Sequence, residues 1–203
     1  MLQSATDIPP ITKSRTRNEL LGVLYELFRE SGFDGVSIHD ISEKSGLGKS
    51  SLYHYFPGGK EEMARAVIEL TRSQVTQHVF TPLTAPVPVN ERIAGMMSGI
   101  DRLYGDGRRA CIMASLLLGH ESDLLGELVA PIFKEWEQHL SQALIEAGCE
   151  PRSAAQRAER ALLTLQGALL LQRILTNRDV FGRAKQDLPQ ILLDNWSPGD
   201  IAS

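Results

Sequence analysis

Residues 37–56 are Ser37-Ile-His-Asp-Ile-Ser-Glu-Lys-Ser-Gly-Leu-Gly-Lys-Ser-Ser-Leu-Tyr-His-Tyr-Phe56, a pattern that predicts a helix, a tight turn and a second helix. Ser37 is a candidate N-cap, because its hydroxyl and the side chain of Asp40 have the spacing at which both satisfy free amides at a helix start. Gly46 lies where a left-handed C-cap is easiest for a residue without a Cβ. The second helix is expected to end at about Phe56, since a proline and two glycines follow.

The second predicted helix presents hydrogen-bond donors on its outer face. Leu52 and Phe56, four residues apart, form its inward apolar stripe. In a helix-turn-helix the second helix lies in the major groove, where such donors meet phosphates and base edges. A serine at a helix N-terminus, such as Ser37, can also meet a phosphate. The predicted DNA contacts are Ser37, Lys49, Ser50, Ser51, Tyr53, His54 and Lys60.

At these residues the chain resembles the TetR family of transcriptional regulators. The run from Gly48 to Phe56, followed shortly by Lys60-Glu61, is similar to that family's recognition helix and the start of its fourth helix. The run from Ser37 to Gly46 resembles the helix before it. The resemblance extends over roughly Lys13 to Leu70, and several of its positions agree in order.

The resemblance implies different roles for the predicted contacts. The chain departs from the family pattern in one place, where Gly58 and Gly59 both precede Lys60 and the pattern has one residue fewer. This departure affects the direction in which the Lys60 side chain points. By resemblance, Tyr53, His54 and Lys60 contact the DNA backbone, and Lys49, Ser50 and Ser51 lie nearest the bases.

The composition is that of an ordinary globular protein. The chain has 203 residues, of which 42% are hydrophobic, enough for one large or two small domains. Its apolar runs are too short or too polar to span a bilayer, and its N-terminus lacks a basic segment followed by an apolar core, so a cytoplasmic location is expected. Cys111 and Cys149 lie far apart without a Cys-x-x-Cys or Cys/His spacing. We therefore expect no disulfide framework, no metal site and no cofactor.

The distribution of charge matters more than its sum. A net charge of −4 argues by itself against a nucleic-acid partner. Between Lys44 and Lys60, however, there are three lysines and no acid, and Lys13, Arg15 and Arg17 form a second acid-free cluster. Either cluster alone is more simply explained as a solvated helix end. Beside a helix-turn-helix pattern, both are better explained as phosphate contacts.

Apolar residues recur at helical spacing along the chain, which predicts an all-α fold. A first helix is expected from Thr12 or Ser14 to about Ser31, and a connector helix from Lys60 to about Val79. The proline-rich run from Thr81 to Asn90 predicts an extended linker. We expect an N-terminal three-helix DNA-binding domain over residues 12–72, which the connector joins to a C-terminal helical effector-binding and dimerisation domain over residues 73–197.

The C-terminal helices are expected over residues 91–104, 108–118, 122–147, 151–177 and from Phe181 onward. The run Ala161 to Leu171 is apolar nearly all round, so its helix must be covered on more than one side. In the TetR family, the last two long helices of each subunit commonly pair into a four-helix bundle. The resemblance therefore implies a homodimer that binds a palindromic double-stranded operator, with half-sites roughly 34 Å apart.

Regulators of this family generally release DNA when a small molecule binds the helical domain, so the resemblance implies a pocket for a small apolar effector in this chain. Methionines and aromatic residues suit such a pocket, although each is more often a core residue. Cys111 is a candidate thiol sensor, and a free cysteine in an apolar helix is more often inert. The candidate pocket residues are Met96, Met97, Tyr104, Met113, Phe133 and Trp136.

These observations predict a ligand-responsive transcriptional repressor. In the alternative, the C-terminal domain is only a structural dimerisation module without a ligand. An enzyme would need converging titratable groups, which the sequence does not offer. In particular, His54 has no nucleophile or carboxylate spaced around it for acid-base chemistry, so no catalytic residue is expected.

Overall fold

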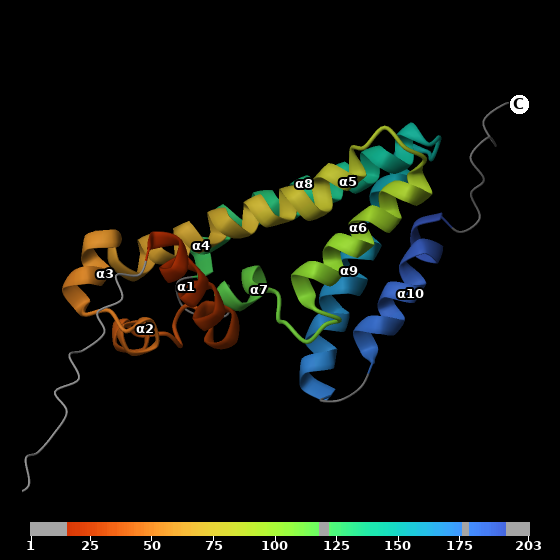
Figure 1. The fold of residues 1–203 in the computed structure, drawn as a ribbon. Helices are drawn as coiled ribbons and strands as arrows, with labels where there is room; N and C mark the ends of the chain where they lie inside the picture. The colour runs from red at the N-terminus through yellow and green to blue at the C-terminus, as the bar shows by residue number, and fades with distance from the viewer. Residues whose placement is uncertain (1–15, 118–121, 176–178, 194–203) are drawn as a thin grey trace, which may run out of the picture.

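The computed structural model describes residues 16–117, 122–175 and 179–193, which form helices joined by turns and contain no strand. The molecule is elongated, with the first three helices at one end and the C-terminal helices at the other (Figure 1). This arrangement confirms the predicted all-α fold. The elements are α1 (Arg17–Ser31), α2 (Ile38–Ser45), α3 (Lys49–Tyr55), α4 (Gly59–Val75), the π-helix η1 (Thr76–Phe80), α5 (Thr81–Leu83), α6 (Val89–Tyr104), α7 (Ile112–Leu116), α8 (Ser122–Glu146), α9 (Pro151–Leu175) and α10 (Val180–Leu193).

Helix α1 begins later than its periodicity predicts. The Thr16 side chain accepts a hydrogen bond from the Glu19 amide at 3.3 Å, and the Glu19 carboxylate accepts one from the Thr16 amide at 2.8 Å. This capping box makes Thr16 the N-cap, with extended backbone angles. The expected start at Thr12 or Ser14 was therefore wrong, because the reciprocal bonds fix the first helical residue at Arg17.

The N-terminal head consists of α1, α2, α3 and the first turns of α4, packed around one small core. Each helix contributes fully buried side chains, and each buried Leu or Phe stabilises the fold by roughly 1.5–3 kcal/mol. The rings of Phe28 and Phe33 stack with centroids 6.0 Å apart, so the turn after α1 is anchored in this core. The fully buried residues of the head are Leu20, Leu24, Phe28, Ile41, Leu52, Phe56, Met63, Ala64 and Val67.

The connector is one continuous helical segment, and it extends beyond the predicted end near Val79. Helix α4 passes through η1 into α5 without a break, so the expectation of an extended linker from Thr81 was wrong for residues 81–83. Pro82 has no amide to donate and would clash with the carbonyl of His78 in a regular α-helix. The wider π turn, in which the Thr81 amide bonds the Thr76 carbonyl, accommodates the proline.

The segment after α6 also differs from its prediction. The expected helix over residues 108–118 is reduced to the five-residue α7, Ile112–Leu116. Gly105, Asp106 and Gly107 have φ of 54°, 56° and 76°, so three successive residues are left-handed and the chain leaves helical geometry here. Apolar composition alone could not show this, because the conformation depends on contacts with α9 and α10.

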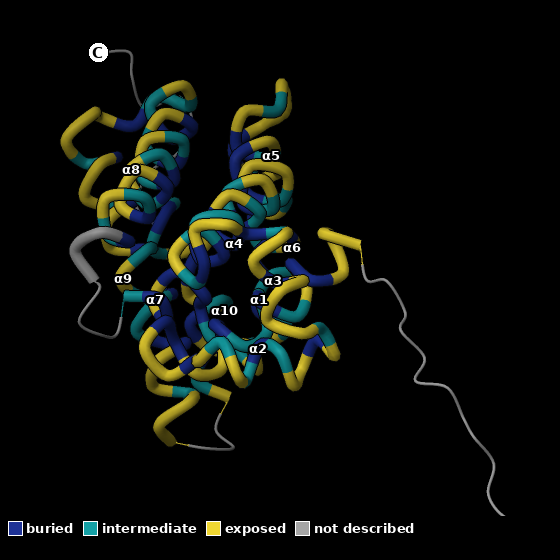
Figure 2. The backbone as a smooth tube through the Cα atoms, turned by 90° about the vertical axis from the view of Figure 1, so that its left-hand side faces the viewer, coloured by how far each residue is buried: buried dark blue, intermediate teal, exposed yellow. Residues whose placement is uncertain are grey.

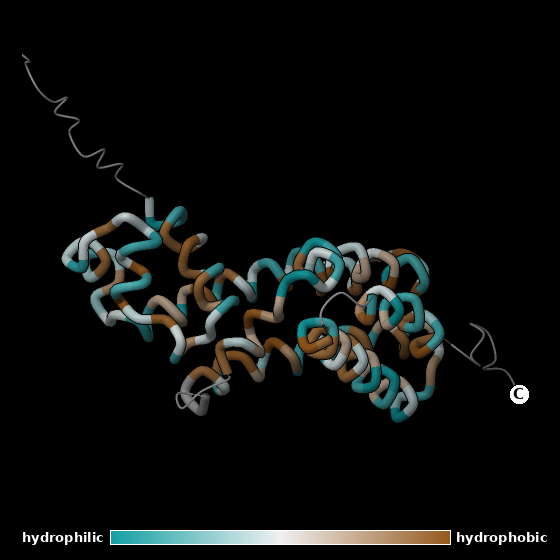
Figure 3. Tube along the Cα trace, turned by 90° about the horizontal axis from the view of Figure 1, so that it is seen from below, coloured by the Kyte–Doolittle hydropathy of each residue, from teal (hydrophilic) through white to brown (hydrophobic). Residues whose placement is uncertain are grey.

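The C-terminal domain is built from α6 to α10, and buried residues line the inner sides of these helices (Figure 2). Seen from below, apolar residues run through both ends of the molecule (Figure 3). Pro131 and Pro189 lie within α8 and α10 respectively. Among the described residues, no helix is long and apolar enough to cross a membrane.

The last turn of α1 is where the head meets the C-terminal domain apart from the connector. The hydroxyl of Ser115 in α7 donates to the Arg29 carbonyl at 3.0 Å, and this bond is buried. The guanidinium of Arg173 in α9 donates to the Glu30 carbonyl at 3.3 Å. Because the last carbonyls of a helix have no partner within it, side chains of the C-terminal domain cap the end of α1.

Candidate nucleic-acid interface

The start of α2 is fixed by the predicted cap. The Ser37 hydroxyl accepts from the Asp40 amide at 3.2 Å, and the Asp40 carboxylate accepts from the Ser37 amide at 2.7 Å and from its hydroxyl at 2.6 Å. The hydrogen bonds from Ser37, its side chain first, lower the pKa of the Asp40 carboxyl. Gly46 has φ 70° and ψ 14°, which confirms the left-handed C-cap.

The turn between α2 and α3 is held by two serines that the sequence analysis missed. The Ser42 hydroxyl donates to the Leu47 carbonyl at 2.6 Å, and the Ser45 hydroxyl accepts from the Leu47 amide at 3.2 Å. Ser45 is buried. Two serines at helical spacing just before a capping glycine are the available sequence signal, because such side chains often bond turn backbone. Together they fix the direction in which α3 leaves α2.

Helix α3 presents most of its hydrogen-bond donors to solvent, whereas Leu52 and the C-cap residue Phe56 face the core. Leu52 and Phe56 are fully buried, which sets the rotation of the helix about its axis. The outward side of α3 is exposed (Figure 2). The exposed residues, all among the predicted contacts, are Lys49, Ser50, Ser51, Tyr53 and His54.

The ring of Tyr53 lies against Gly59, the second of two successive glycines. It is 46% exposed, and a Cβ built on Gly59 would lie 3.4 Å from Tyr53 Cε1. Gly59 has φ 66°, a conformation that residues with a side chain rarely adopt. Gly59 therefore allows both the positive φ of the turn into α4 and the close approach of the Tyr53 ring.

The side chain of Lys60 is engaged within the head. Its Nζ donates to the Phe33 carbonyl at 3.0 Å and lies 4.2 Å from the centroid of the Phe33 ring. The side chain is half-buried and ties the start of α4 to the turn between α1 and α2. In this structure the ammonium stabilises the head, and its contact with DNA stays a prediction.

One residue of the upstream basic cluster is placed beside α3. The guanidinium carbon of Arg17 lies 5.0 Å from the centroid of the Phe56 ring, a cation–π contact that brings the first turn of α1 to the end of α3. Lys13 and Arg15 lie outside the described residues. Lys44, in the last turn of α2, is exposed. Arg17 and Lys44 thus add positive charge to the surface that carries α3.

The candidate effector residues lie in or against the core of the C-terminal domain. The Phe133 and Trp136 rings stack with centroids 6.4 Å apart. The Trp136 Nε1 is buried and has no hydrogen-bond partner among the described residues. Met96, Tyr104, Met113 and Trp136 are buried, and Met97 and Phe133 are half-buried against them.

Cys111 is packed in the same core. Burial raises the pKa of its thiol, and the Tyr104 hydroxyl donates to its sulfur at 3.7 Å. A buried thiol with a raised pKa carries little of the reactive thiolate. This environment favours the inert alternative over thiol sensing.

Comparison with known proteins gives two family matches. The family described as "Bacterial regulatory proteins, tetR family" matches residues 20–67, which cover α2, α3 and parts of α1 and α4. The family described as "Transcriptional regulator LmrA/YxaF-like, C-terminal domain" matches residues 93–187.

Curated relatives match most of the chain. An HTH-type transcriptional regulator of Mycobacterium tuberculosis (strain CDC 1551 / Oshkosh) is 30% identical over 182 residues, 80% of this chain and 88% of the relative. The HTH-type transcriptional repressor DhaR of Mycobacterium sp. (strain GP1) is 26% identical over 178 residues, 83% of this chain and 88% of the relative.

Solved structures share the fold. A TetR transcriptional regulator from Legionella pneumophila superimposes with a TM-score of 0.74 at 20% identity, over 90% of this chain and all of that one. The transcriptional regulator FadR from Bacillus subtilis, solved in complex with stearoyl-CoA, gives a TM-score of 0.67 at 16% identity, over 87% of this chain and 98% of that one.

Proposed function

The chain belongs to the TetR family of bacterial DNA-binding transcriptional regulators, and we propose that it is a repressor that a small molecule releases from its operator. Members of this family are regulators and not enzymes. The proposal divides the chain as the sequence suggests, with residues 12–72 binding DNA and residues 73–197 binding the effector and a second subunit.

The observation that carries the DNA-binding part is the orientation of α3. Burial of Leu52 and Phe56 and the two serine bonds in the preceding turn fix this helix. Its exposed hydrogen-bond donors are Lys49, Ser50, Ser51, Tyr53 and His54. A helix held in this way can enter the major groove without rearranging the head. Exposed Arg17 and Lys44 flank it and are suited to phosphates on either side.

The outward face of α9 supports a homodimer. Four apolar residues on this face are between 47% and 68% exposed, which is unusual for side chains of their size. A second copy of the chain packed on this face would bury them and relate the two α3 helices by two-fold symmetry. A palindromic operator then follows from the symmetry of the protein. The four residues are Leu163, Leu170, Leu171 and Ile174.

The effector part is supported by the way the two domains are joined. The connector runs unbroken from the head to α5, and Ser115 and Arg173 cap the end of α1 from the other domain. A ligand that favours a different position of the C-terminal helices would therefore shift the heads out of register with the major grooves. The structure of FadR with stearoyl-CoA shows that this fold can hold a small molecule.

The DNA-binding proposal is tested with the full chain. Selection of bound DNA from a random pool would supply the operator, and fluorescence anisotropy would then measure its affinity at several salt concentrations. Lys49→Ala should weaken binding, and the salt slope distinguishes its role: a fall of about 1 indicates a lost phosphate contact, whereas relaxed sequence preference indicates a lost base contact. Tyr53→Phe, which removes only a hydroxyl, should also weaken binding.

Lys134→Ala is the matched control, because Lys134 is exposed on α8 in the C-terminal domain. It should leave both the affinity and the salt slope unchanged. If Lys49→Ala and Tyr53→Phe bind as the wild type does, α3 is not the recognition helix. If DNA binds normally and no ligand ever releases it, the alternative of a purely structural C-terminal domain is correct.

A further inference from the structure

An arginine-lined cleft of about 780 Å³ lies where the head meets the C-terminal domain. Its walls come from the last turn of α1, the loop between α6 and α7, and the C-terminal half of α9. Its volume falls in the range of small-molecule sites. The lining residues are Arg29, Glu30, Gly107, Arg108, Arg109, Ala110, Leu169, Gln172, Arg173 and Asp179.

The cleft has an excess of positive charge, with four arginines against two acids. One of the acids is already occupied, because the Asp179 carboxylate accepts from the Gly182 amide at 3.0 Å at the start of α10. The Arg108 side chain is 80% exposed, and its nearest carboxylate, that of Asp106, is 3.9 Å away. Among the described residues, Arg29 pairs with Glu26, whereas Arg109 and Arg173 form no ion pair.

Arg29 gives an independent sign that the cleft lacks an acceptor. The residue is 9% exposed, and its Nη1 is buried without any hydrogen-bond partner among the described residues. Its Nη2 pairs with Glu26. A buried guanidinium nitrogen without an acceptor is costly, and such groups are rare in folded proteins. An anion in the adjoining cleft would supply negative charge where this guanidinium has an unfilled donor.

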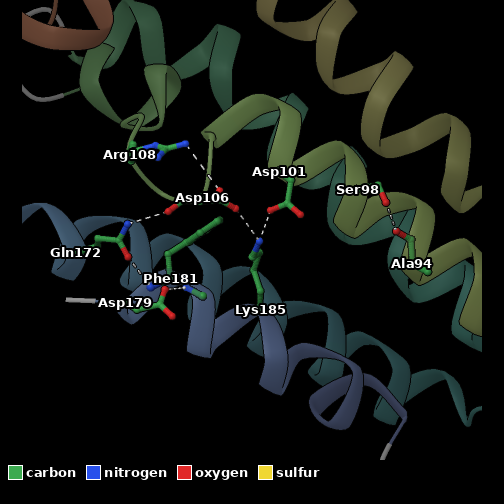
Figure 4. A network of polar contacts seen from close by, with 10 residues as sticks. Ala94, Ser98, Asp101, Asp106, Arg108, Gln172, Asp179, Phe181 and Lys185 are labelled. Atoms are coloured by element: carbon green, nitrogen blue, oxygen red, sulfur yellow. Dashed lines mark hydrogen bonds and ion pairs between the residues drawn. The ribbon is translucent and has the colours of Figure 1, made fainter. Parts of the chain in front are cut away.

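The loop that carries Arg108 and Arg109 is held in place before any ligand binds (Figure 4). Gln172 donates to the Asp106 carbonyl at 2.9 Å and accepts from the Phe181 amide at 2.8 Å. Lys185 bridges the carboxylates of Asp106 and of Asp101 on α6. A site fixed in this way loses little conformational entropy when it binds a ligand.

Arg173 connects the cleft to the head. Its guanidinium donates to the Glu30 carbonyl at 3.3 Å, a long bond to a neutral acceptor. A carboxylate or phosphate would form shorter and stronger charge-assisted bonds with the same group. An anion in the cleft would therefore compete for Arg173 with the end of α1.

The remaining lining residues define the rest of the ligand. Leu169 and Ala110 contribute apolar surface beside the arginines, which suits a ligand with an apolar body and an anionic group. At 100° per residue, Leu169 lies about 100° around α9 from exposed Leu170, whereas Arg173 lies only about 60° from Leu170, so the cleft adjoins the exposed apolar face.

We propose that this cleft binds an amphipathic organic anion, a carboxylate or a phosphate, through Arg108, Arg109 and Arg173. The inference rests on the proposed function in one respect, namely that this anion is the effector that releases DNA. The binding site itself stands on the geometry and charge of the cleft.

Isothermal titration calorimetry with the full chain tests the site. Decanoate and inorganic phosphate are the anionic ligands, and decan-1-ol is the uncharged control for decanoate. Decanoate should bind, and phosphate should compete with it. Decan-1-ol should bind at least about tenfold more weakly. Failure of both anions to bind, or equal binding of decanoate and decan-1-ol, would overturn the proposal.

Variants locate the binding. The double variant Arg109→Gln/Arg173→Gln should lower the affinity for decanoate by about tenfold or more. Arg152→Gln, an exposed arginine at the start of the same helix, should have no effect. Should the double variant fail to fold, Arg108→Glu tests the same site, because the Arg108 side chain is exposed. This variant should also lower the affinity for decanoate. Unchanged affinity in the variant that folds would refute the site.

The same ligands added to the protein–DNA complex separate the two proposals. Release of DNA by decanoate that disappears in Arg108→Glu supports both the site and the effector mechanism. If decanoate binds through the arginines and DNA stays bound, the site is correct and its role as the effector site is wrong. If another molecule releases DNA equally from wild type and Arg108→Glu, the regulator mechanism is correct and the effector acts elsewhere.

Discussion

The crossing between the connector and α6 provides a quantitative test of the fold. Gly99 of α6 lies against the π-helical turn, and a Cβ built on it would be 1.7 Å from the His78 carbonyl oxygen and 2.6 Å from its carbonyl carbon. An ordinary carbon–oxygen contact is roughly 3.3 Å or longer. In Gly99→Ala one helix must therefore move by about 1.5 Å, and both partners in the clash are backbone.

Two effects oppose each other in this substitution. Alanine is favoured over glycine inside a helix by about 1 kcal/mol. Overpacking of a well-packed contact costs typically about 1–3 kcal/mol, and a clash with backbone belongs at the upper end. The net loss should be about 2 kcal/mol, which lowers Tm by about 4–8 °C for a chain of this size.

Differential scanning calorimetry at fixed protein concentration measures this shift, since Tm of an oligomer depends on concentration. Gly22→Ala in α1 is the matched control, because a Cβ there meets nothing within 4 Å. It should raise Tm by about 2–3 °C through helix propensity alone. If Gly99→Ala raised Tm as Gly22→Ala does, the close approach of α6 to the connector would be refuted.

Four further substitutions test the head and the dimer interface. Ser37→Ala removes the N-cap of α2 and should lower the free energy of unfolding by about 1 kcal/mol in urea denaturation. The pKa of Asp40 is lowered in the folded state, so the ionised carboxylate stabilises the fold above the ordinary carboxyl pKa. This stabilisation is lost as the pH falls through the lowered pKa. The difference in unfolding free energy between wild type and Asp40→Asn should therefore close in acid. Lys60→Gln should cost about 1 kcal/mol of stability by removing the bond to the turn after α1, whether or not DNA affinity also falls. Leu170→Asp should give monomers in analytical ultracentrifugation while Gln138→Asp on α8 should not, and a persistent Leu170→Asp dimer would exclude the α9 face as the interface.

The elements that the sequence predicted well are those fixed by short-range bonds. The cap of α2 joins residues three apart, the glycine at its end needs only a left-handed backbone, and the end of α3 follows from the proline after Phe56. The exposed residues of α3 followed from the same signals, because burial of Leu52 and Phe56 determines what the opposite side of α3 exposes.

The elements that it predicted poorly depend on contacts between distant residues. A Cβ on Gly107 would lie 2.5 Å from Phe181 Cβ, so the loop before α7 is shaped by a helix near the end of the chain. Lys60 turns to the Phe33 carbonyl, a partner that no local pattern indicates. The cleft was missed for the same reason, because its arginines come from three separate segments and only the fold brings them together.

The head is attached to the C-terminal domain in two ways of unequal strength, and this inequality indicates which attachment a ligand can change. The connector is a continuous helix, so breaking it would cost many backbone bonds at once. The end of α1 is held by the hydrogen bonds from Ser115 and Arg173, each worth about 1 kcal/mol net. Allosteric coupling typically amounts to about 1–3 kcal/mol, which matches the loss of one or two such bonds. A ligand that withdraws Arg173 from α1 would weaken this second attachment, which also includes the packing of α1 against α7, while the connector stays intact.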